Sequence, residues 1–232
     1  MNNAMNTYHS IIIIIIGGMY MIKVFIAVIL FVIIFKVLNM PHRNRKFEVI
    51  AGMSLIVTFI INTIVLIVTD GVEAFISRGL PLFQCSLGMI TQIYYLLKDK
   101  EPDVFFKNAN VIAILGSIMA IFFSSILNNN FMEYLVCVFS HIIFLMISVY
   151  SIWVRDIRLK KDEYKTCVKI LCTWNIFIFI INIFLKTNYS FVSQSPFTFY
   201  INPILVLICN TLLFIIFYFI DYKYLSMIKT RR

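Results

Sequence analysis

The chain of 232 residues is 61% hydrophobic and 13% charged, with a mean hydropathy of +0.93 and a net charge of +9. This composition excludes a soluble globular protein and indicates a polytopic membrane protein. Because a helix needs roughly 20 residues to cross a hydrocarbon core of ~30 Å, the length allows six or seven spans and no separate soluble domain.

An all-α fold is expected, because the long apolar runs lack the alternating pattern of a lipid-facing barrel strand and contain little Gly or Pro. The runs predict a bundle of seven transmembrane helices within one membrane domain, 1–232. The spans are expected at about residues 16–38, 49–68, 80–97, 105–127, 131–154, 167–185 and 201–220.

Basic residues alternate between the joints that connect these spans. All but three of the 20 Lys and Arg side chains fall in alternate joints, at the adjoining span ends or in the C-terminal tail. Cytoplasmic joints collect such residues, so the pattern predicts an outside N-terminus and an inside C-terminus in the plasma membrane. A six-span arrangement would put two strongly basic joints on opposite faces of the membrane, so seven spans are preferred. The positive charge orients the helices and meets an anionic leaflet, so no nucleic-acid partner is implied.

The cysteines do not indicate a disulfide framework or a metal site. There are five, an odd number, and no CxxC pair is present. Cys137 and His141 share a helix face at a spacing of four, but no second close pair completes a tetrahedral ligand set. No metal and no cofactor are therefore expected.

Polar residues inside the predicted spans are the candidate functional residues, because such residues are costly in lipid. Cys85 and Gln92 share one stripe of the third span, and Asn175 and Asn182 share a stripe of the sixth. His141 lies in the fifth. Cys85 is expected ~7 Å below the outer surface and His141 ~15 Å below it, so two polar faces could converge around the histidine.

A thiol and an imidazole together suit nucleophilic chemistry. Cys85 would need a base such as His141, with help from the N-terminus of its own helix, whose first turn is expected to contain Pro81. At the headgroup boundary such a pair would meet a lipid ester carbonyl. Asn182, Gln92 or Asn188 could donate hydrogen bonds to the oxyanion.

A structural reading of the same residues stays open. Buried cysteines often act as small apolar residues, and on the residues alone this is the favoured reading of Cys85. Asn175 and Asn182 are typical of hydrogen bonds between helices. A histidine in mid-span usually has a function or a dedicated partner.

Three short motifs carry a family resemblance. LPLFQC at 80–85, FSHIIF at 139–144 and TNYSFVSQSP at 187–196 resemble the pattern of YwaF-type bacterial integral membrane proteins. The same pattern is similar to the transmembrane protein 164 acyltransferase family and, more distantly, to the androgen-induced hydrolases of fatty-acid esters. The resemblance covers about residues 45 to 222.

The resemblance implies that Cys85 is the acyl-accepting nucleophile and His141 its base. It also implies that Asn188 and Tyr189 line the outer mouth of the site and that Pro196 shapes that joint. The remaining candidates for substrate binding or oxyanion support are Gln84, Gln92 and Asn182.

The expected function is acyl transfer or ester hydrolysis on membrane lipids at the outer leaflet, through a thioester on Cys85. The alternative is a non-enzymatic carrier or lipid-binding protein that uses the same polar cavity. A purely structural subunit is a third possibility. The sequence does not specify an oligomeric state, because seams of small residues serve packing within and between chains.

Overall fold

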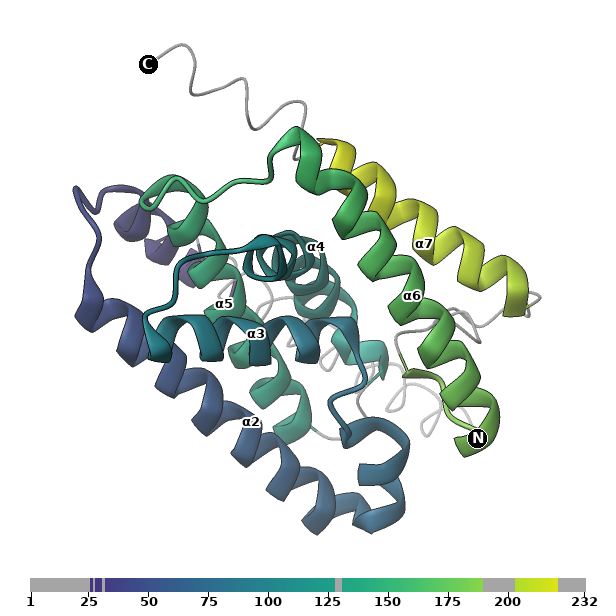
Figure 1. The fold of residues 1–232 in the computed structure, drawn as a ribbon. Coiled ribbons are helices and arrows are strands. Elements are labelled where there is room, and N and C mark those ends of the chain that lie inside the picture. Colours follow the sequence, from purple (N-terminus) through teal and green to yellow (C-terminus); the bar gives the residue numbers. More distant parts are fainter. Residues whose placement is uncertain (1–25, 27, 31, 128–130, 190–202, 221–232) are drawn as a thin grey trace, which may run out of the picture. The chain divides into compact units, whose positions relative to one another are not determined.

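The computed structural model describes residues 26, 28–30, 32–127, 131–189 and 203–220. It divides into two units, 1–40 and 41–232, and the first contains a short apolar helix, Val28–Leu38. The second contains α2 (Arg45–Ala74), the π-helix η1 (Phe75–Gly79), α3 (Gln84–Lys98), α4 (Val104–Leu127), α5 (Phe131–Trp153), α6 (Lys161–Leu185) and α7 (Pro203–Ile220), as Figure 1 shows. Every regular element in the described part is helical, which confirms the all-α prediction.

Four helices in the described part are long and apolar enough to cross a membrane. They comprise Arg45–Gly79, Val104–Ile121, Phe131–Trp153 and Lys161–Leu185. The chain is therefore a membrane protein with several apolar helices. The count of seven spans and the orientation of the termini stay predictions, and residues 16–25 and 201–202 of the predicted spans lie outside the described residues.

The first of these helices is 35 residues long, well beyond the predicted span 49–68. It begins at Asn44, whose side chain accepts a hydrogen bond from the backbone N–H of Phe47, as an N-cap should. Near its end Gly71 adopts φ 84° and ψ 177°. This conformation is open to glycine and strained for other residues, so Gly71 allows the chain to kink before η1.

The third predicted span, 80–97, begins later than expected. Leu80 is extended, at φ −65° and ψ 148°, as the residue before a proline usually is, and Phe83 is the N-cap. The helix α3 therefore starts at Gln84, and Pro81 precedes it; the prediction that Pro81 lies in the first turn was wrong. With 15 residues α3 is ~23 Å long, shorter than a hydrocarbon core.

A charged cluster joins one end of α2, α3 and α5. The carboxylate of Glu48 is fully buried and pairs with Arg43 at 2.8 Å, Arg45 at 3.2 Å and Arg155 at 3.4 Å. Arg45 also donates to the carbonyl oxygens of Leu96 and Leu97. These oxygens lie in the last turn of α3 and have no partner within that helix. The cluster thereby fixes the C-terminal end of the short helix.

The core of the second unit lies where α3, α4 and α5 meet. Fully buried Phe106 and Ala113 from α4 pack with Phe144 and Ile147 from α5 and with Leu96 from α3. The helices α6 and α7 lie side by side and contact α4 as well. This arrangement surrounds the first turn of α3 with three longer helices.

Candidate functional site

The turn before α3 is held by Tyr189. The Tyr189 hydroxyl donates to the carbonyl oxygen of Ile76 and accepts from the backbone N–H of Leu80, at 3.4 Å. Its ring packs edge-on against Phe83 with centroids 5.2 Å apart. Burial raises the pKa of Tyr189, an effect that the hydrogen bond from Leu80 partly offsets. We call Tyr189 and the 80–83 turn the loop clamp.

Asn182 fixes Tyr189 in turn. Its amide oxygen accepts from the backbone N–H of Tyr189 at 2.8 Å and from the hydroxyl of Thr187 at 2.9 Å. Its amide nitrogen donates to the carbonyl oxygen of Tyr189 at 3.0 Å. The chain leaves α6 through Lys186, which has φ 52°. The amide of Asn182, predicted as an oxyanion donor, is thus engaged in holding the loop.

Cys85 is the second residue of α3 and packs closely against α4. A Cβ placed on Gly116 would lie 3.5 Å from the Cβ of Cys85, so the glycine allows the two helices to approach. Gly116 is the thirteenth of the 24 residues of α4. Cys85 therefore lies beside the middle of α4.

His141 lies halfway along its helix, as the eleventh of the 23 residues of α5. It is 7% exposed. Its Nδ1 lies 2.8 Å from the carbonyl oxygen of Cys137, one turn earlier, and 3.7 Å from the Cys137 Sγ. A carbonyl can only accept, so Nδ1 carries the proton and Nε2 of the neutral ring offers its lone pair.

Gln92 belongs to a buried polar group that joins three helices. Its amide nitrogen donates to the side-chain oxygen of Asn110 on α4 at 3.0 Å and to the hydroxyl of Ser148 on α5 at 2.8 Å. Ser148 also donates to Asn110 at 3.3 Å. We call these three residues the amide layer; each is at most 1% exposed.

The amide layer sets the register between α3 and α5. One turn nearer the start of α3, Gly88 faces Phe144, since a Cβ on Gly88 would lie 2.6 Å from the Phe144 Cζ. Gln92 and Ser148 are separated by 56 residues in the chain. Gly88 and Phe144 have the same separation, so the two contacts advance by four residues along each helix. Three residues earlier on each helix stand Cys85 and His141, whose pairing stays a prediction.

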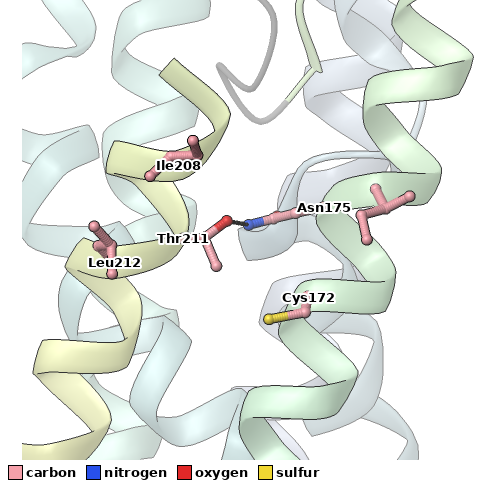
Figure 2. Close-up of a pocket in the computed structure, with 6 residues that line it drawn as sticks. Cys172, Asn175, Ile208, Thr211 and Leu212 are labelled. Carbon is pink, nitrogen blue, oxygen red and sulfur yellow. Dashed lines mark hydrogen bonds between the residues drawn. The ribbon is translucent and has the colours of Figure 1, made fainter. Parts of the chain in front are cut away.

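Gln84 connects α3 to α6 and α7. It donates to the side-chain oxygen of Asn175, whose amide nitrogen donates to the hydroxyl of Thr211 at 2.9 Å. Asn175 and Thr211 stand at a groove of about 250 Å³ between α6 and α7 (Figure 2). The groove is lined by Cys172, Asn175, Ile176, Ile208, Thr211 and Leu212.

A model of the TMEM164 family matches residues 6–221. The chain belongs to the TMEM164 family. The match includes all six α-helices of the second unit and every candidate site residue. No curated protein and no solved structure matches the chain significantly.

In this TMEM164-family protein two of the three motifs noted in the sequence meet. LPLFQC and TNY come together in the loop clamp, where Tyr189 binds backbone groups of the turn. Asn188 is half-buried beside it, and Pro196 lies outside the described residues. Among the described residues, no cluster of His, Cys, Asp and Glu could hold a metal ion.

Sequence reasoning overlooked several buried polar residues of the TMEM164-family protein. Asn110 and Ser148 complete the amide layer, and Glu48 organises the charged cluster. The spacing held a signal for Asn110, because it lies seven residues before Ser117, another polar residue, on one face of an apolar helix. Glu48 lies just before the predicted span 49–68, where a charged residue gives no such signal.

Proposed function

We propose that this TMEM164-family protein transfers or hydrolyses acyl groups of membrane lipids through a thioester on Cys85, with His141 as the base. The register between α3 and α5 is the observation that carries the proposal. The pairs Gln92–Ser148 and Gly88–Phe144 each span 56 residues, as does the pair Cys85–His141. The thiol and the imidazole are thus expected on facing stripes at one depth.

The position of Cys85 at the start of α3 offers groups that can stabilise a thiolate once a base has taken the proton. The first backbone N–H groups of a helix have no partner within the helix, and the helix dipole places partial positive charge there. Burial of the thiol opposes ionisation, so the proposed reaction needs His141 as the base. The loop clamp supports the stabilisation of a thiolate, because it fixes where the helix begins.

The reaction follows from the two side chains. His141 Nε2 takes the thiol proton of Cys85, and the sulfur attacks the ester carbonyl of a lipid. As the C–S bond forms and the C–O bond breaks, His141 returns the proton to the departing alkoxide. A hydroxyl of water or of a second lipid then gives its proton to His141 and attacks the thioester. The C–S bond breaks, and the sulfur takes the proton back.

The groove between α6 and α7 suits the acyl chain of the same lipid. Apolar side chains line most of it, and its polar members, Asn175 and Thr211, bond to each other. Asn175 also accepts a hydrogen bond from Gln84, the neighbour of Cys85 in the chain. A chain held in this groove would approach the thiol along the first turn of α3. We propose the outer leaflet as the source of the lipid, from the distribution of basic residues.

Site-resolved labelling tests the proposal. Purified protein in phosphatidylcholine vesicles is treated with the p-nitrophenyl ester of a fatty acid, and acylated peptides are identified by mass spectrometry. Cys85 should be acylated in the unaltered protein, and His141→Ala should reduce the rate about 10² to 10⁴-fold. Cys167→Ala, which removes a buried thiol that does not line the groove, is the matched control and should leave the rate unchanged.

Vesicles containing a phospholipid with an isotopically labelled acyl chain distinguish the alternatives. Movement of label to other lipids, or release of free fatty acid, supports the enzyme if Cys85→Ser abolishes it. Binding or transfer of intact lipid that survives Cys85→Ser and His141→Ala supports the carrier instead. Unchanged labelling kinetics in His141→Ala would remove the basis of the proposed mechanism.

A further inference from the structure

Ser117 is a buried hydroxyl whose bonding capacity is unused in the described part of the chain. It lies on α4, is 0% exposed, and its Oγ has no hydrogen-bond partner. Two other buried serines of the bundle are paired, since Ser140 donates to the carbonyl oxygen of Val136 at 2.8 Å and Ser148 belongs to the amide layer, whereas Ser151 also has an unpaired Oγ. A buried polar group without a partner costs about 1 to 3 kcal/mol, so Ser117 needs an explanation.

Helix periodicity places Ser117 at the level of the proposed catalytic pair. Seven residues make nearly two helical turns, so positions seven apart face the same direction ~10.5 Å along the axis. On α3, Cys85 lies seven residues before Gln92. On α5, His141 lies seven residues before Ser148. From Asn110, seven residues forward along the antiparallel α4 lead to Ser117.

An independent contact supports this register between α3 and α4. Gly116, the neighbour of Ser117, faces the Cβ of Cys85 across 3.5 Å. The three residues Cys85, Ser117 and His141 therefore repeat the three-helix arrangement of the amide layer two turns away. The amide layer shows that side chains on these faces reach one another.

We propose that the Ser117 hydroxyl is the oxyanion donor of this site, an inference that rests on the proposed function. When the Cys85 sulfur adds to the ester carbonyl, the carbon–oxygen double bond opens and the oxygen gains negative charge. The Ser117 O–H donates a hydrogen bond to that oxygen and keeps its own proton throughout. His141 performs the proton transfers, and the double bond reforms as the alkoxide leaves.

Three other hydrogen-bond donors near the site are already engaged and are not needed as oxyanion donors. Asn182 and Gln92 have amide nitrogens that already donate within the protein. His141 Nδ1 donates to the carbonyl oxygen of Cys137. Ser117 is the hydroxyl that the register brings to the same level without a partner of its own.

Two probes of different chemistry test the assignment. A fatty acyl p-nitrophenyl ester reacts with Cys85 through a tetrahedral oxyanion, forming C–S and releasing nitrophenolate. An N-alkyl iodoacetamide forms C–S as the C–I bond breaks, with no oxyanion. In Ser117→Ala, acylation of Cys85 should slow about 10² to 10³-fold, the usual loss for one oxyanion donor, while alkylation stays within about twofold.

Ser151→Ala is the matched control. Ser151 lies on α5, is 0% exposed and also has an unpaired Oγ, but it is ten residues beyond His141. Both rates should be unchanged in this variant. If Ser117→Ala lowers the folded yield, Ser117→Thr and Ser117→Val repeat the comparison. Threonine and valine have nearly equal volume, and only threonine has a hydroxyl. The threonine variant should acylate at least tenfold faster than the valine variant.

The outcomes separate this inference from the proposed function. Equal slowing of acylation and alkylation in Ser117→Ala would overturn it, because the serine would then position the thiol or the imidazole. No slowing of either reaction would overturn it as well. A Cys85 that neither probe modifies, or whose acylation ignores His141→Ala, would refute the proposed function and the oxyanion role together.

Discussion

Replacing Tyr189 by phenylalanine tests the loop clamp most directly. The substitution keeps the fully buried ring against Phe83 and removes only the hydroxyl. That oxygen donates to Ile76 and accepts a long bond of 3.4 Å from Leu80, so most of the loss comes from the Ile76 carbonyl. Leaving such a group unpaired in a buried position costs about 1 to 3 kcal/mol.

Thermal unfolding in detergent micelles measures this loss. A change of about 2 kcal/mol corresponds to a fall in Tm of roughly 4 to 8 °C for a chain of this size. Acylation of Cys85 should also slow about tenfold or more, because the turn sets the position of the helix start. Tyr94→Phe, at a residue that is 44% exposed, is the control and should leave Tm and acylation unchanged.

The pH dependence gives a second measure of the same clamp. Burial raises the pKa of Tyr189 above its ordinary value of 10. Its contribution to stability is therefore complete below pH 10 and is lost as the pH rises through the higher folded pKa. Tyr189→Phe should lack this alkaline loss. If Tyr189→Phe unfolds within 1 °C of the unaltered protein and acylates Cys85 at the same rate, our account of the clamp is wrong.

Four further substitutions test other parts of the bundle. Glu48→Gln removes the carboxylate that three arginines share, and should lower the unfolding free energy by about 3 kcal/mol in chemical denaturation; an unchanged midpoint would contradict this. Arg43 forms a hydrogen bond with Asp99 and lowers the pKa of that carboxyl. The contribution of Asp99 to stability is therefore complete above its ordinary pKa of about 4, and it declines as the pH falls through the lowered pKa. Asp99→Asn should flatten the acid limb of a Tm profile below about pH 5. Gly88→Ala forces a Cβ against the buried ring of Phe144 and should cost about 1 to 3 kcal/mol. Gly116→Ala, with its nearest atom at 3.5 Å, should unfold at the temperature of the unaltered protein or above it.

Hydrophobic runs of helical length allowed the all-α fold to be predicted. The predicted runs 105–127 and 131–154 lie within one residue of α4 and α5, because most residues of both helices are apolar. The start of α3 was missed because the decisive contact is not local. Tyr189 binds the 80–83 turn from more than a hundred residues away, and no local pattern in the sequence shows that contact.

The candidate site was predicted in part. Cys85 and His141 stood out as reactive groups in apolar helices, and their pairing stays a prediction. The depths expected from the span boundaries differed by ~8 Å, since each depth was counted from the end of its own helix. A contact between two helices, such as that of Gly116 with Cys85, shows which residues lie at the same level, and the sequence alone does not show such contacts. The amide layer needs three helices at once, so no single helical pattern shows it.

The loop clamp also constrains how the protein is made. The partner of Leu80 is 109 residues further along the chain, so it does not exist when α3 leaves the ribosome. At a synthesis rate of about 5 to 20 residues per second, the short helix waits roughly 5 to 20 s for that tyrosine. During this interval the backbone groups around Leu80 lack their final partner, and α3 is too short to span a bilayer alone. We therefore expect the turn before α3 to reach its final structure only after α6 and Tyr189 have been synthesised.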